Sequence, residues 1–281
     1  MSSKMMQTRG RKASLPGCHR FRLVVEELEF RWVPSTFLWD PPQADRNWTA
    51  HENSRKYDNL LGWLGTNNVP GANDDVEFKG EWEGDFGTYE ANKPCIIDQA
   101  VIVKSIKMYP DYSSTLYLQS ELRIDRALWM LGPGHISGYP INGQVNRGPL
   151  ITDGLFEWRD GTLINVTVED KGILTVDSIS TPEMSNAVID VQHELRWKRG
   201  NVAVSGESVS GILIQSQGTF DITAEGSWGG NPARLNVTNN GTLTLDTQGI
   251  ASISGGYVTM GTTKLNSGTL ALGGQANQTA A

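Results

Sequence analysis

A repeat with a long period is the feature that most constrains how this chain can fold. Repeats with periods of about 20 to 50 residues indicate solenoids, propellers or helical arrays. The chain carries no WD40, kelch, ankyrin or tetratricopeptide signature. Five residues recur 39 positions later in the same order: Trp158, Gly161, Gly172, Ile173 and Leu174 return as Trp197, Gly200, Gly211, Ile212 and Leu213.

Short strand-like segments fill the chain from Cys95 onward. They are rich in β-branched residues, alternate apolar and polar positions, and are separated by Gly, Asn, Asp or Ser turns. Many begin with Gly followed by Thr or an aliphatic residue, at Gly161, Gly172, Gly211, Gly218, Gly241 and Gly268. Further segments of this kind are 95–97, 101–103, 115–118 and 163–168.

Strands this short fit a chain that coils in rungs of about 20 residues with three faces each, so the 39-residue period is two rungs. We therefore expect an all-β chain that folds as a right-handed parallel β-helix, a β-solenoid, with a short irregular N-terminal cap. A β-sandwich is the alternative, but it gives no reason for the repeat. The alternation predicts that Leu174, Leu213, Leu243 and Leu245 point inward, and that Gly, Asn and Asp occupy the corners.

Charge divides the chain into a basic arm and an acidic body. Of its 281 residues, the first 33 have a net charge of +4, whereas the whole chain has −7 and the remainder therefore −11. We expect a basic, disordered or export-related arm at 1–36, a Trp-, Asn- and Gly-rich entry and capping segment at 37–94, and the solenoid at 95–281. An acidic body argues against nucleic acid as a partner. No apolar run is long enough for a membrane-spanning helix.

The composition favours a location outside the cell, although no secretory h-region is present in the arm. Residues 201–281 contain only six charged side chains among many Thr, Ser, Asn and Gln residues, as expected for a secreted solenoid. The two cysteines, Cys18 and Cys95, cannot build a disulfide framework, and we expect both to be free.

Residues 25–36, VEELEFRWVPST, follow the basic arm. This segment resembles the L-E-x-L-E-x-R-x-x-P-S-like signature of planctomycete-type secreted and surface proteins, with Val25 where the first Leu is usual. The segment from Trp39 to Val76, with Asn47-Trp48 and NVPGANDDV at 68–76, resembles the entry of autotransporter-like β-helix proteins. The resemblance implies export to the cell surface and no established enzymatic activity.

Two sets of side chains are candidates for binding. Asp74 and Asp75 precede a strand and could supply oxygen ligands to Ca²⁺, or they could cap the turn through backbone N–H groups. Trp158 and Trp197 occupy equivalent positions and could stack on sugars if exposed. Phe156 lies two residues before Trp158 and so shares its face, which favours a stacked core ladder instead.

No catalytic or cofactor-binding motif is present, so a non-catalytic extracellular or cell-surface solenoid with a structural, adhesion or matrix role is expected. One alternative is a polysaccharide lyase or hydrolase, with Asp153, Asp160 and Asp177 as candidate acid–base groups. The other is a glycan-binding module, which a patch of outward aromatic rings would favour. Cell-surface or matrix polysaccharide is the expected partner. Self-association is also expected, because 268–281 read as an uncapped last rung, either of a fragment or of a rung completed by another chain.

Overall fold

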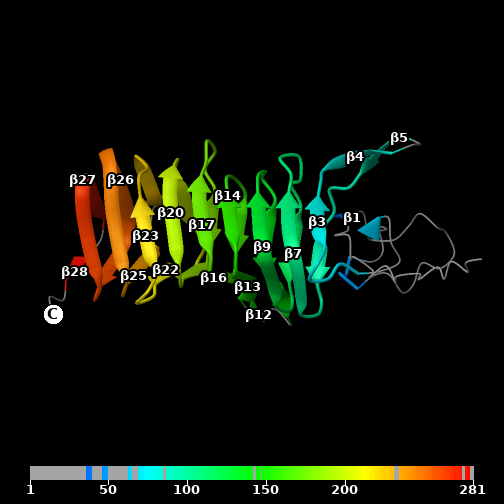
Figure 1. The fold of residues 1–281 in the computed structure, drawn as a ribbon, viewed down its shortest axis with the longest axis horizontal. Coiled ribbons are helices and arrows are strands. Elements are labelled where there is room, and N and C mark those ends of the chain that lie inside the picture. The colour runs from blue at the N-terminus through cyan, green and yellow to red at the C-terminus, as the bar shows by residue number, and fades with distance from the viewer. Residues whose placement is uncertain are drawn as a thin grey trace, which may run out of the picture. The chain divides into compact units, whose positions relative to one another are not determined.

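The computed structural model describes residues 36–39, 46–49, 63–64, 69–84, 87–141, 144–145, 147–230, 234–273 and 276–278. The basic arm, Cys18 and nearly all of the 25–36 motif lie outside these residues. In the described part the secondary structure is entirely β, with no helix, and it forms a parallel β-solenoid of about 8 turns (Figure 1). The predicted fold class is therefore confirmed.

Each rung contributes one strand to each of three faces. The first face stacks β6 (Cys95–Ile97), β8 (Thr115–Leu118), β10 (His135–Gly138), β15 (Thr162–Ile164), β18 (Glu183–Ser185), β21 (Val202–Ser205), β24 (Gly226–Gly229), the middle of β26 (Thr242–Thr259) and the end of β27 (Thr262–Gly273).

The second face begins with the first halves of two long strands that turn a corner. It stacks β7 (Val101–Met108), β9 (Leu122–Met130), β13 (Gly148–Thr152), β16 (Val166–Asp170), β19 (Val188–Val191), β22 (Ser210–Ile214), β25 (Leu235–Asn239), the end of β26, and β28 (Ala276–Gln278).

The third face includes strands from the segment before Cys95. It stacks β1 (Thr36–Trp39), β3 (Asp75–Phe78), the second halves of β7 and β9, β14 (Leu155–Trp158), β17 (Ile173–Asp177), β20 (Glu194–Arg199), β23 (Thr219–Ile222), and the starts of β26 and β27.

Three antiparallel pairings accompany the stack within the described ranges. The strand β2 (Trp63–Leu64) pairs with β1, and β4 (Glu81–Gly84) forms a hairpin with β5 (Gly87–Glu90). A second small hairpin, β11 (Pro140–Ile141) with β12 (Gln144–Val145), is inserted between the first and second faces of one rung.

The strand register explains the long repeat in the sequence. On the third face, Leu155 pairs with Ile173 in the next rung, and Ile173 pairs with Glu194 in the rung after that. The same two steps lead from Trp158 through Val176 to Trp197, so the prediction that the period spans two rungs is confirmed for this pair of tryptophans. Gly161 and Gly200 are equivalent corners two rungs apart, with positive φ angles of 84° and 85° that favour glycine.

Asparagine takes the same role at another corner. Asn165 and Asn186 have φ angles of 51° and 53°, and Asn186 Nδ2 donates a hydrogen bond of 3.1 Å to Asn165 Oδ1 in the preceding rung. Asn165 thereby divides the segment 163–168, which the sequence pattern reads as one strand, into β15 and β16.

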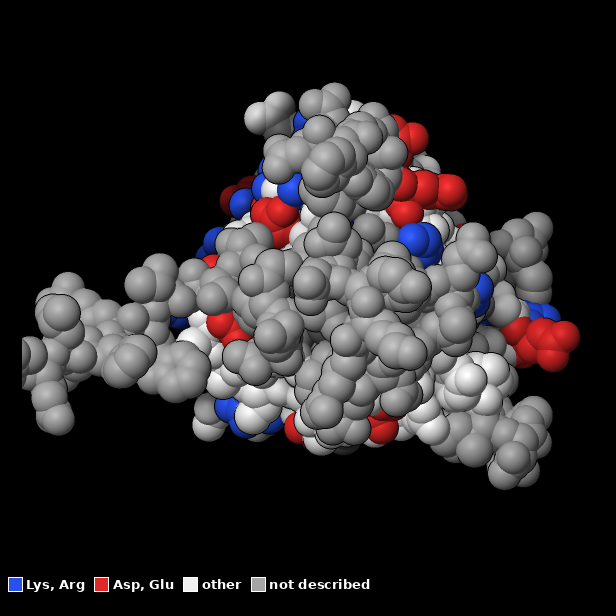
Figure 2. Space-filling model, turned by 90° about the vertical axis from the view of Figure 1, so that its right-hand side faces the viewer, with Lys and Arg blue, Asp and Glu red and all other residues white. Residues whose placement is uncertain are grey.

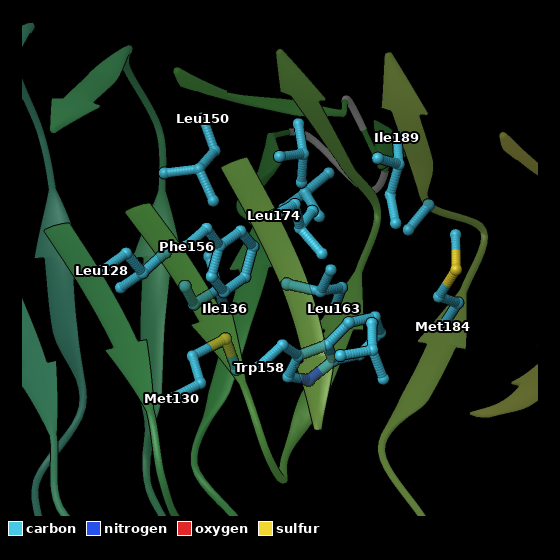
Figure 3. Close-up of a cluster of buried hydrophobic side chains, with 14 of the residues drawn as sticks. Leu128, Met130, Ile136, Leu150, Phe156, Trp158, Leu163, Leu174, Met184 and Ile189 are labelled. Carbon is cyan, nitrogen blue, oxygen red and sulfur yellow. The ribbon is translucent and has the colours of Figure 1, made fainter. Parts of the chain in front are cut away.

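The interior is a continuous apolar ladder supplied by all three faces. Figure 3 shows Phe156, Trp158 and Leu174 from the third face in one buried cluster with Leu163 and Met184 from the first. Trp158 and Trp197 are fully buried, as the core-ladder interpretation predicts. Leu174, Leu243 and Leu245 are also fully buried, as predicted.

Leu213 contradicts the predicted register. It lies half-buried on the outer side of β22, while its neighbours Ile212 and Ile214 point into the core. On the third face, more residues separate Glu194 from its strand partner Thr219 than separate Ile173 from its strand partner Glu194. Gly211 therefore falls on the second face, although Gly172 leads into a third-face strand, and the sequence match between them is accidental.

This difference gives a paired test of the register. We expect Leu243→Ala to lower the free energy of unfolding by about 2–5 kcal/mol, because it leaves a cavity in the ladder. The same substitution at half-buried Leu213 should cost about 1 kcal/mol or less. Urea unfolding of both variants measures the difference, and equal losses would contradict the register described here.

Candidate functional site

The two aspartates considered for Ca²⁺ have other partners. Asp74 Oδ2 accepts a hydrogen bond of 2.9 Å from the Gly71 backbone N–H, which is the turn-capping alternative. Asp75 forms an ion pair of 2.6 Å with Lys104 and accepts a hydrogen bond from Ser105. Burial raises the pKa of Asp75, but these hydrogen bonds and the Lys104 charge outweigh it, so the pKa lies below its usual value. Within the described ranges, no group of three or more His, Cys, Asp or Glu side chains is placed to hold a metal ion.

Trp158 and Trp197 cannot form a sugar-stacking platform, because both side chains are fully buried. Trp197 Nε1 donates a hydrogen bond of 2.9 Å to the carbonyl oxygen of Gly200, and its ring contacts Trp228 edge-on at 5.7 Å. The hypothesis that these two rings bind glycans is therefore wrong, and the alternative of a core ladder is correct.

The three candidate acid–base aspartates are held by separate partners. Asp153 pairs with Arg123, and Asp177 pairs with Arg199 at 2.8 Å. Asp160 Oδ1 accepts a hydrogen bond of 2.7 Å from the backbone N–H of Gly161 at a corner. The structure therefore gives each carboxylate a local structural contact.

The structure instead brings together outward side chains on the third face that the sequence analysis did not select. The register places Glu77, Lys107, Trp129 and Glu157 in one row across β3, β7, β9 and β14. Two residues further along each rung, a second row contains Lys79, Tyr109, Leu131 and Arg159. Because alternate residues of a strand share a face, the two rows form one surface at the edge of the third face.

Charged side chains at the N-terminal part of this surface contact Tyr109. Its hydroxyl donates a hydrogen bond of 2.9 Å to Glu77 Oε1, and Glu77 forms an ion pair of 2.7 Å with Lys79. The Nζ atoms of Lys79 and Lys107 lie 4.7 and 4.3 Å from the Tyr109 ring centroid. Both distances are within the range of cation–π attraction.

A hollow of about 250 Å³ lies beside this cluster, and we call it the Trp129 hollow. It is lined by Lys107, Trp129, Leu131, Glu157 and Arg159. Arg159 forms an ion pair of 2.5 Å with Glu157, which fixes the guanidinium at one side. One rung thus contributes the apolar side chains of Trp129 and Leu131 to the hollow, and the rungs before and after it contribute charged side chains.

Period-two alternation could not have identified Trp129 as an outward residue. It lies in the wholly apolar run 127–131, in which Leu128 and Met130 are fully buried and Trp129 is half-buried. An apolar run gives no sign of which side faces solvent. The only available signal is the number of residues that separate this run from Leu122 and Ile124, which point inward. Both lie an even number of positions before Leu128, so counting in twos makes Leu128 inward and Trp129 outward.

One buried carboxyl group has a strongly perturbed pKa. Asp170 ends β16 inside the solenoid, is fully buried, and accepts a hydrogen bond of 3.4 Å from the Thr152 hydroxyl in the preceding rung. Burial raises its pKa to about 7 and the Glu194 charge adds to this rise, although the backbone N–H groups of Gly172 and Leu174 oppose it. Asp170 faces the core, so its effect is on stability.

The fold and this surface define a β-solenoid protein with an outward aromatic and charged patch. No protein-family model matches the chain significantly, and neither does any curated protein or solved structure. In the part of the chain that the structure describes, no helix has the length and hydropathy needed to cross a membrane.

Asp170 predicts a specific dependence of stability on pH. Between pH 4 and about 7 the folded chain keeps a proton on Asp170 that the unfolded chain releases, so stability should fall as the pH rises through this window. The loss is on the order of a few kcal/mol. Asp170→Asn, which stays neutral, should remove this part of the slope. Urea unfolding at pH 5 and pH 8 measures it, and an identical slope in both proteins would contradict the assignment.

Proposed function

We propose that this chain is a non-catalytic β-solenoid that binds carbohydrate through the Trp129 hollow, in an adhesion or matrix role at the cell surface. The observation that carries the proposal is a half-buried tryptophan on the outside of a solenoid face, between two charged rungs. Aromatic rings bind the apolar faces of ligand rings, and fixed polar groups beside them set orientation. The ion pair between Glu157 and Arg159 and the Tyr109 cluster supply such groups.

The spacing of carboxylates on this surface argues against a glycoside hydrolase there. Glu77 and Glu157 lie in the same row but three rungs apart, which is about 14 Å at the usual spacing of neighbouring strands. A catalytic carboxylate pair is separated by about 5–9.5 Å. Each of the two is also bound to a cation of its own rung. The arrangement therefore favours binding over hydrolysis.

The distribution of charge supports a location outside the cell and a partner other than nucleic acid. Residues 201–281 have only six charged side chains, and the whole chain has a net charge of −7. Among the described residues visible in Figure 2, both basic and acidic side chains lie around the margin of the view. The likeness of residues 25–36 to surface-protein signatures supports the same location.

Trp129 should be essential for carbohydrate binding. We expect Trp129→Ala to weaken binding to the glycans recognised on an array by about tenfold or more, because it removes the stacking surface. Thr244→Ala, further along the same third-face row and away from the hollow, should have no effect. Isothermal titration on folded protein checks both. A chain that binds no glycan, or binds equally after Trp129→Ala, would contradict the proposal.

The proposed matrix role includes self-association through β27. Among the described residues, β27 pairs only with β26, so no described strand covers its other edge. Such an edge is a template for pairing with another chain. Leu265, on this strand, is 60% exposed, and neighbouring Met260 is 70% exposed.

Association should therefore rise with protein concentration. We expect Leu265→Lys to reduce it, because a charge on an edge strand opposes pairing. Leu155→Lys, at an exposed position on the third face away from this edge, should leave it unchanged. Sedimentation velocity over a range of concentrations measures the effect. A single monomeric species at high concentration would contradict self-association.

A further inference from the structure

We infer that the Trp129 hollow selects anionic sugars, and that Lys107 binds their carboxylate or sulfate group. This inference rests on the proposed function and adds the chemical class of the ligand. It follows from the pairing of the charges around the hollow and from the position of Lys107 in the rows.

The charges of the surface do not cancel. Lys79 is paired with Glu77, and Arg159 is paired with Glu157. Lys107 has no carboxylate within ion-pair distance among the described residues, and its ammonium lies against the Tyr109 ring. The two rows therefore hold three cations and two carboxylates, and the cation without a carboxylate partner in them is Lys107. This local excess stands out on a chain whose net charge is −7.

The register places that excess charge beside the stacking surface. Lys107 Cα is the strand partner of Trp129, so the two side chains leave neighbouring rungs about 4.8 Å apart, on the same side of the sheet. A pyranose ring stacked on Trp129 would direct a substituent toward the Lys107 ammonium. On the opposite side, Glu157 is directly in register with Trp129 and would repel an anion. An acidic sugar therefore has one favoured orientation.

Lys107 is also positioned before a ligand arrives. Its cation–π contact with Tyr109 holds the ammonium, and the Tyr109 hydroxyl is fixed by its hydrogen bond to Glu77. Since neither contact neutralises Lys107, the charge remains available to an anion. The ion pair that Arg159 forms with Glu157 makes Arg159 the weaker anion-binding group of the hollow.

Matched oligosaccharides test this inference directly. A uronic-acid oligosaccharide should bind at least about tenfold more tightly than its fully methyl-esterified form, which has the same rings without the charge. A sulfated oligosaccharide and its desulfated parent form the second arm. Preference for the anion in either arm or both supports the inference and identifies the anionic group. Raising the salt concentration should weaken the preference, because the charges are partly exposed to solvent.

Two lysine variants make the assignment specific. Lys107→Gln removes the charge, and we expect it to abolish the preference for the charged over the neutral oligosaccharide. Lys264→Gln is the matched control, since Lys264 lies in the same outward row at the other end of the solenoid, on β27. It should bind like the unaltered protein. Circular dichroism confirms that both variants are folded.

The outcomes separate this inference from the proposed function. Equal binding of charged and neutral forms, with binding still lost in Trp129→Ala, would overturn the anion preference and leave carbohydrate binding in place. A preference that survives Lys107→Gln would overturn the role of Lys107. If no oligosaccharide binds at all, both the inference and the proposed function fail.

Discussion

Parallel stacking of each rung on the next is the interaction on which the rest of this structure depends. It satisfies the backbone hydrogen bonds of short strands that could not be stable alone, and it lines up their inward side chains as one core. The corners must then bring neighbouring backbones very close. A Cβ on Gly172, for example, would lie only 1.8 Å from the carbonyl oxygen of Gly154 in the preceding rung.

The same stacking makes the outer surface a set of rows, so the character of each part of the surface depends on single residues within a row. On the third face the row passes through Lys107, Trp129 and Glu157 and continues with Thr175. An aromatic residue and charged residues at neighbouring rungs give the proposed binding surface its character without altering the core. Inward positions have no such freedom, because each side chain contacts the rungs on both sides.

Asp170 shows what a polar residue costs at an inward position. Its partners are a hydroxyl of the preceding rung and backbone N–H groups of its own corner, and burial raises its pKa to about 7. The outward carboxylate Glu157 is instead paired with Arg159 at the surface. The two carboxyl groups therefore differ in their surroundings, the first buried in the core and the second paired at the proposed binding surface, although both belong to the same few rungs.

The sequence by itself determined the all-β class, the two-rung repeat, and the inward position of Trp158 and Trp197, because periodicity and alternation are local properties that all rungs share. Only the tertiary structure decided which face each strand joins. The number of residues between strand partners on the third face differs from rung to rung. A sequence match at a fixed distance therefore placed Leu213 on the wrong side of its strand. The Trp129 hollow was hidden for a related reason. Its residues come from three separate rungs, and only the pairing of β7, β9 and β14 brings them side by side.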